Sequence, residues 1–272
     1  MSVICKMRKI HILNLVISLW ILFSLVSCQK EDTGEEEPYG NITFTFLHKV
    51  EGSPLEIDIM QYVNEAGNQY MVNEIQYFIS NVTLHRPDGS TFLIDDFKDI
   101  HYLDTDLNET LEWKVYDHIP VGSYSEISFT FGIGEDKNHS LMYVNPPESL
   151  MFWPEFLGGG YHYMKLNGKW LDSNQQISPF NFHLGIGQIY DSTGTITGFI
   201  HNNFNISLPQ SSLIITENEW TDIEVVMNIE KWFTSPHTYN HDEWGGDIMQ
   251  KQEAMKIACE NGHDVFSSNI LK

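Results

Sequence analysis

The chain has 272 residues, of which 37 are acidic and 15 are basic, giving a formal net charge of −22 at pH 7. So acidic a protein is a poor partner for nucleic acid, which binds basic surfaces, and a better one for cations. Of the three cysteines, Cys5 and Cys28 lie near the N-terminus, which leaves Cys259 alone in the rest of the chain. We therefore expect no intramolecular disulfide and no thiolate metal cluster in the folded domain.

The N-terminal segment has the pattern of a lipoprotein export signal. Basic residues precede an apolar run over residues 10–26, and the sequence LVSC ends this segment at Cys28. This pattern predicts a signal peptide over residues 1–27, with a lipobox-like ending that leaves Cys28 as the lipidated N-terminus. A retained membrane anchor is the weaker alternative, because the apolar run is short for a spanning helix.

Residues 28–40 are polar and acidic, with no apolar periodicity, and are typical of a solvated tether. An acidic run directly after a lipidated cysteine resembles the export signal of surface lipoproteins in Bacteroidota. We therefore expect an outer-membrane lipoprotein, on either the periplasmic face or the cell surface.

Residues 41–272 have the pattern of one β-rich domain. Short segments with alternating apolar residues, or rich in β-branched and aromatic residues, are separated by turn signals such as Pro87-Asp88-Gly89 and Asp191 to Gly194. The expected strands cover residues 42–50, 71–84, 91–94, 125–133, 161–166, 180–186, 196–206 and 223–229. This pattern predicts an all-β fold, a β-sandwich or jelly-roll-like single domain.

One helix is expected near the C-terminus. Residues 247–260 place apolar side chains at helical spacing, and Gly262 follows as a plausible stop.

Four histidines are candidates for a site. His48 lies on the apolar face of the first strand, at its end, and His183 points away from the face that carries Phe182 and Leu184. His237 and His241 lie in a loop dense in His, Asp and Trp, for which a polar surface crossover is the simpler interpretation. We expect most of the other histidines after the signal, His162 among them, to be ordinary structural or surface residues.

The sequence contains none of the usual catalytic motifs. It has no His-Glu-x-x-His zinc-hydrolase spacing, no Gly-x-Ser-x-Gly elbow, no phosphate-binding glycine loop and no dinucleotide fingerprint. We therefore expect a binding protein and not an enzyme.

The segment Met151 to Lys165, MFWPEFLGGGYHYMK, combines a Trp, three consecutive glycines and an aromatic strand. Composition alone predicts a core Trp beside a turn in which backbone approaches backbone closely.

Several motifs in a fixed order resemble the MbnP family. They are His48 at a strand end, NEIQYFISNVTL, FGIGEDKNHS, the Met-x-Trp segment at 151–153 leading to GGYHYMKLNG, then FNFHLG, VVMNIEKWF and ENGHDVF. The resemblance covers residues 41 to the C-terminus. It implies a largely β domain that binds copper outside the cytoplasm.

The resemblance also implies how copper is held. Histidines bind the metal, in some members together with a kynurenine that a di-haem cytochrome c peroxidase-type partner makes from a Trp, and Trp153 matches that position. His48 and His183 match the family's strand-end His and Phe-x-x-His-like motifs, and His237 and His241 remain weaker candidates. Glu155 stands where family members often carry a second Trp. Because a carboxylate is a hard ligand, Glu155 favours calcium or zinc over copper.

Two other functions fit the same composition. The first is a surface module that binds glycans or proteins, with Trp153, Trp170, Trp220 and Trp244 stacking on sugars. The second is a calcium-stabilised structural domain, which the acidic balance permits.

Overall fold

The computed structural model describes residues 37–96 and 99–271, and Pro38 to the C-terminus forms one compact unit. The predicted signal peptide, Cys28 and most of the tether lie outside the described residues. Within the described ranges, no helix is both long enough and apolar enough to cross a membrane.

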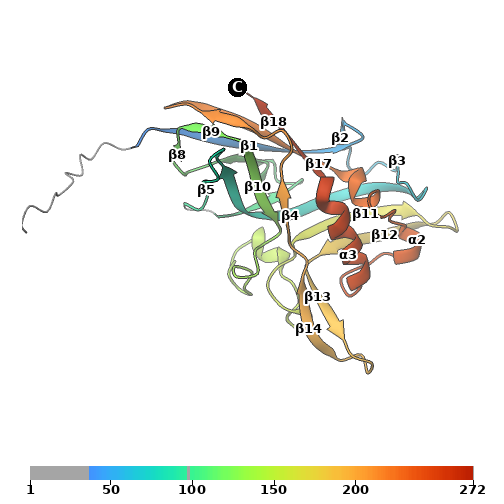
Figure 1. Cartoon of the computed structure of the whole chain (residues 1–272). Coiled ribbons are helices and arrows are strands. Elements are labelled where there is room, and N and C mark those ends of the chain that lie inside the picture. The colour runs from blue at the N-terminus through green and yellow to red at the C-terminus, as the bar shows by residue number, and fades with distance from the viewer. Residues whose placement is uncertain (1–36, 97–98, 272) are drawn as a thin grey trace, which may run out of the picture. The chain divides into compact units, whose positions relative to one another are not determined.

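The first sheet is built on β1 (Tyr39–Val50). Along one edge β1 pairs in parallel with β17 (Trp220–Asn228), which pairs antiparallel with β18 (Phe266–Leu271). Other parts of β1 pair with three short strands, namely β2 (Ser53–Pro54), β7 (Glu112–Lys114) and β8 (Ile119–Pro120). Figure 1 shows β17 and β18 running along β1.

The second sheet is organised around the long strand β4 (Gln69–His85). Its order is β12 (Ile177–Leu184), β11 (Met164–Leu171), β4, β10 (Glu126–Phe131) and β15 (Phe204–Ser207). The short strands β3 (Tyr62–Val63), β5 (Thr91–Leu93) and β6 (Ile100–Asp104) pair with further stretches of β4.

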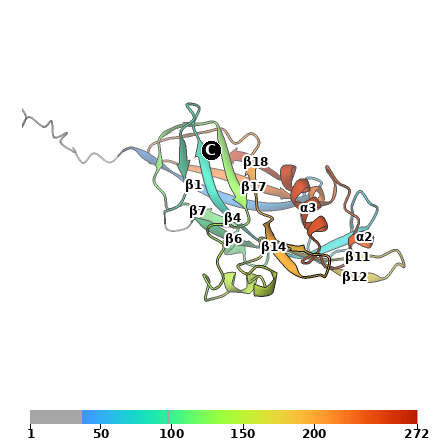
Figure 2. The ribbon, with the colours of Figure 1, turned by 60° about the horizontal axis from the view of Figure 1, so that its bottom comes forward.

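Smaller elements complete the domain. Strands β13 (Ile186–Tyr190) and β14 (Ile196–His201) form a hairpin that projects from the body in Figure 1, and β9 (Gly122–Tyr124) pairs with β16 (Leu213–Ile215). Among the described residues, the α-helices are α2 (His241–Trp244) and α3 (Gln252–Asn261), and both lie at the end of the domain where β11 and β12 run (Figures 1 and 2). The 3-10 turns in the same part of the chain are η1 (Asn108–Thr110), η2 (Glu148–Met151), η3 (Glu155–Leu157), η4 (Ile229–Phe233) and η5 (Gly262–Asp264).

The core lies between the two sheets and fixes the face to which each residue of β4 points. Tyr77 is buried and contacts Phe131 of its own sheet and Phe266 of the other, so its side chain lies in the inter-sheet core. Because successive side chains of a strand point to opposite faces, Gln76 and Phe78 lie on the outer face. The segment carrying η2 and η3 lies on that outer side, beyond β4 and β6 as seen from β1 (Figure 2).

The predicted fold class is confirmed, since the domain is a mostly antiparallel β-sandwich with one sizeable helix near its C-terminus. The helix begins at Gln252, later than predicted. Gly262 does not have the left-handed conformation of a helix stop, and its φ is −60°. A Cβ at Gly262 would lie 2.2 Å from Cζ of Phe204, so this glycine is required by close packing.

Candidate metal centre

The loop after η2 brings Trp153 and His162 together, although eight residues separate them. Phe152 and Tyr161 form an isolated antiparallel bridge, and the Trp153 N–H donates to the carbonyl oxygen of Gly160 at 2.9 Å. The two ends of the loop are thereby closed. The indole ring of Trp153 then stands edge-on to the imidazole of His162, with ring centroids 4.6 Å apart.

The three consecutive glycines make this loop possible. Gly158, Gly159 and Gly160 have φ values of 123°, 70° and 76°, in a region that residues with a Cβ rarely adopt. The space is also closed to a side chain, because a Cβ at Gly158 would lie 2.5 Å from Ile186 and one at Gly160 2.5 Å from Asn138. The glycine run therefore determines how Trp153 and His162 face each other.

His162 meets His183, which comes from β12. The centroids of the two imidazole rings are 5.1 Å apart and the rings are nearly perpendicular, at 85°. His183 pairs with Lys165 across β12 and β11, and Lys165 pairs with Gln76 of β4, so all three lie on the outer face. His162 is buried, and His183 is half-buried.

Hydrogen bonds fix the tautomer of both imidazoles. Nδ1 of His162 lies 2.9 Å from the carbonyl oxygen of Met151, which only accepts, so Nδ1 carries the proton. Nε2 of His183 lies 2.7 Å from Oδ1 of Asn167, whose amide nitrogen in turn donates to the Glu74 carboxylate at 2.9 Å. The amide orientation is set by Glu74, so Nε2 of His183 is likewise the donor.

The remaining two ring nitrogens carry lone pairs. Nε2 of His162 and Nδ1 of His183 are buried and have no hydrogen-bond partner among the described residues. Burial lowers the pKa of both histidines to about 3; the charge of Lys165 adds to this effect in both, and that of His183 adds to it in His162. Both imidazoles are therefore neutral at physiological pH.

Two neutral imidazole nitrogens in a largely buried site suit a metal that accepts few, borderline-soft ligands, and Cu(I) is such a metal. Outer carbonyl groups that hold the ring N–H are the usual support of a metal-binding histidine. Trp153 is not itself a ligand in this arrangement, since its indole N–H donates to the carbonyl oxygen of Leu157 at 3.2 Å. The indole instead packs against Gly185, where a Cβ would lie 2.5 Å from Cε3 of Trp153.

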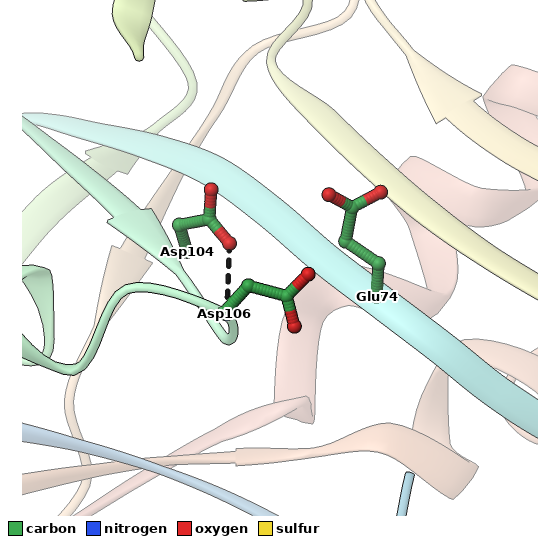
Figure 3. Close-up of side chains that lie close together, drawn as sticks. All are labelled: Glu74, Asp104 and Asp106. Carbon is green, nitrogen blue, oxygen red and sulfur yellow. Dashed lines mark hydrogen bonds between the residues drawn. The ribbon is translucent and has the colours of Figure 1, made fainter. Parts of the chain in front are cut away.

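An acidic cluster lies on the same outer face. Glu74, Asp104 and Asp106 hold carboxylate oxygens within 4.8 Å of one another, and Figure 3 shows Asp104 turned toward the backbone of Asp106 with Glu74 opposite them. The chain of hydrogen bonds from His183 through Asn167 ends at Glu74. The histidine pair therefore borders a region of negative charge.

Lys165 lies between the imidazole pair and the acidic cluster, since the strands align His183, Lys165, Gln76 and Asp104 in one row. Its Nζ donates to the carbonyl oxygen of Leu150 at 2.6 Å, while burial lowers its pKa and the charges of Glu74 and Asp104 counteract that effect.

His48 does not share this site, which corrects the expectation that it meets His183. Its ring stands edge-on to Tyr77, with centroids 5.7 Å apart, in the core between the sheets. Tyr77 aligns with Met164 and Leu184, the face opposite to that of His183. The sheet itself thus separates the two histidines.

The two loop histidines are also elsewhere. His237 contacts the Glu260 carboxylate at the surface of α3. His241 is fully buried among aromatic rings, and it stacks on Phe180 with centroids 4.4 Å apart. Phe180 and His183 point to opposite faces of β12, so His241 does not join the pair.

Two of the four Trp residues considered for stacking on sugars are buried, Trp153 at 0% and Trp170 at 5% exposure. Trp244 is half-buried, and Trp220 is exposed. Glu155 is exposed, and its carboxylate lies near Gly159 rather than at the imidazole pair.

Sequence reasoning selected His183 and Trp153 but missed His162. The signal was the position of His162 directly after the three glycines, in the same segment as Trp153. A histidine that follows a tight loop whose other end carries a candidate site residue is a candidate itself.

Comparison with known proteins agrees with the fold described above. A family model described as MbnP matches residues 39–250. Among solved structures, MbnP from Methylosinus trichosporium is similar with a TM-score of 0.52 at 14% identity, covering 85% of this chain and 99% of that one. No curated protein matches.

Proposed function

Because the chain belongs to the MbnP family, which is associated with copper, we propose that it is a copper-binding protein whose metal is held by His162 and His183. The single observation that carries this proposal is the pair of buried, unpartnered ring nitrogens on two imidazoles in contact. Each of these nitrogens carries a lone pair, because the other nitrogen of its ring donates a hydrogen bond. A buried acceptor without a partner destabilises the folded protein unless a ligand such as a metal ion binds to it.

The role is capture, not catalysis. Copper held between neutral imidazoles and screened by Trp153 is withdrawn from solvent, which suits handling of the ion outside the cytoplasm. In this proposal the chain is a lipoprotein of the outer membrane, anchored through Cys28 and facing the periplasm or the cell surface. The negative charge around Glu74 supports cation approach.

Trp153 is the position at which the family resemblance implies oxidation to kynurenine by a di-haem cytochrome c peroxidase-type partner. The location of Trp153 supports this, since its indole contacts His162. Kynurenine would add an amine and a carbonyl group beside the pair. The metal, held by two imidazole nitrogens, would then gain a third donor atom without any change of fold.

The test is copper bound per chain after the purified full chain is loaded with Cu(I) under reducing conditions and desalted. We expect one copper per chain, lost in His162→Ala and in His183→Ala. The matched control is His48→Phe, which alters a histidine that also has an unpartnered buried Nε2 but lies in the inter-sheet core. The control is expected to keep the copper.

Two results would contradict the proposal. One is a folded wild-type chain that retains no copper. The other is copper retained by the His162→Ala/His183→Ala double variant, which would move the site elsewhere. Mass analysis of the peptide containing Trp153 separately tests whether the residue is oxidised.

A further inference from the structure

A second group of carboxylates lies away from the imidazole pair, where two loops of the domain meet. Asp95 and Asp96 follow the buried Ile94 at the end of β5, and Asp117 follows the buried Val115 after β7. One ligand oxygen of each of the three acids lies within 4.8 Å of the other two.

Asp117 is directed into this group. Its Oδ1 accepts the N–H of Asp95 at 2.9 Å and that of Asp96 at 3.2 Å, so the carboxyl group faces the loop that carries the other two acids. Its side chain is only 2% exposed. Its second oxygen, Oδ2, is buried and has no hydrogen-bond partner among the described residues.

A buried carboxylate oxygen without a partner is costly, because that oxygen has lost its water and gained no hydrogen bond in exchange. Burial accordingly raises the pKa of Asp117, and the charge of Asp96 acts in the same direction against the two backbone hydrogen bonds. Within residues 37–96 and 99–271, none of the three acids forms an ion pair with a basic side chain. A bound cation would supply the missing charge.

We propose that Asp95, Asp96 and Asp117 form a calcium site that ties the loop after β5 to the loop after β7. The donors are all carboxylate oxygens, which hard cations prefer. One oxygen of each acid lies close enough to the other two to share a single ion. Ca²⁺ takes six to eight oxygen ligands in a flexible geometry, whereas Mg²⁺ demands a near-ideal octahedron, so a cluster of three carboxylates completed by water suits Ca²⁺ better.

The exposure of the site agrees with this assignment. Asp95 and Asp96 are exposed, so the ion can enter from solvent and keep water molecules as its remaining ligands. Asp117 supplies the buried anchor. The site is independent of the copper proposal, because its residues belong to other strands and other loops.

The experiment measures calcium binding by isothermal titration of the purified full chain with CaCl₂ after calcium removal with EGTA. We expect one Ca²⁺ per chain, with a dissociation constant near the range of extracellular modules, about 10⁻⁴ to 10⁻³ M. Asp95→Asn/Asp96→Asn is expected to weaken binding at least tenfold. Both substitutions are at exposed positions, so the fold should survive them.

The matched control is Asp106→Asn, an exposed acid of the other acidic cluster, which should leave the calcium affinity unchanged. Asp117→Asn keeps the size and the Oδ1 acceptor and should abolish binding; if this variant fails to fold, the surface double variant decides. The assignment is overturned if the folded wild type binds no calcium, if the double variant binds as well as wild type, or if Asp106→Asn removes binding. Equal affinity for Mg²⁺ would also overturn it.

Discussion

His241 should make the protein sensitive to acid. This side chain is fully buried, and its ring packs against those of Phe180 and Trp170 with centroid distances of 4.4 and 5.6 Å. Neither of its ring nitrogens has a hydrogen-bond partner among the described residues. The imidazole thus packs in an aromatic cluster like an apolar ring, and its protonated form would place an unpaired charge in this buried environment.

Burial lowers the pKa of His241 from 6.5 to about 3, with a smaller opposing effect from Asp242. At a pH between the pKa of the unfolded chain, 6.5, and that of the folded chain, about 3, only the unfolded chain binds a proton at this residue. The free energy of unfolding therefore decreases as the pH drops through this range. At pH 5, which is about 1.5 units below the unfolded value, the loss amounts to about 2 kcal/mol. Replacement of His241 by Phe removes this loss.

The assay is urea unfolding of wild type and His241→Phe at pH 8 and at pH 5. The free energy of unfolding of the variant minus that of wild type should be about 2 kcal/mol larger at pH 5 than at pH 8, because only wild type is destabilised by acid at this position. The other buried histidines are present in both proteins and cancel. His118→Phe is the control, since His118 is exposed and also stacks on a ring, that of Tyr39. An equal difference at both pH values for His241→Phe would refute this reasoning.

Two further changes probe the imidazole pair. Gly185→Ala places a Cβ 2.5 Å from the indole of Trp153, so we expect a loss of about 1–3 kcal/mol of stability in urea unfolding together with weaker copper binding. Gly198→Ala, whose Cβ would lie 3.4 Å from its nearest neighbour, should do neither. Lys165→Met removes a positive charge beside His183, and competition titrations should show Zn²⁺ binding tighten about tenfold relative to Cu(I), because repulsion scales with ionic charge. An unchanged ratio would show that Lys165 does not select for the monovalent ion.

Much of the fold could be predicted because alternation of apolar side chains reports directly on burial of a strand's face. Residues 42–50 and 223–229 alternate in this way, and both are strands of the first sheet. The predicted strand bounds were wrong where a side chain interrupts the strand without interrupting the sequence pattern. The expected strand over 196–206 is two strands, β14 and β15, because Asn202 turns its amide to the Gly185 carbonyl and to Gln252 between them.

The site was less accessible to sequence reasoning. The face to which His183 points was predicted correctly from its neighbours in β12, since alternation determines it. The partner of His183 was not, because His162 precedes β11 in an irregular stretch where no period assigns a face. The separation of His48 from His183 depends on the order of strands across two sheets, which local patterns do not contain.

The parallel pairing of β1 with β17 has a consequence for how the chain must fold. Residues 41–49 pair with residues 220–228, so the central strand of the first sheet acquires its long partner only when most of the polypeptide has been synthesised. Contacts so distant in sequence carry a large loop-closure cost and form slowly. Until then, β1 exposes an unpaired edge with Phe44 and Phe46 beside it, which is a target for aggregation or for a chaperone. Truncation before residue 220 is therefore expected to yield an insoluble chain rather than a smaller domain.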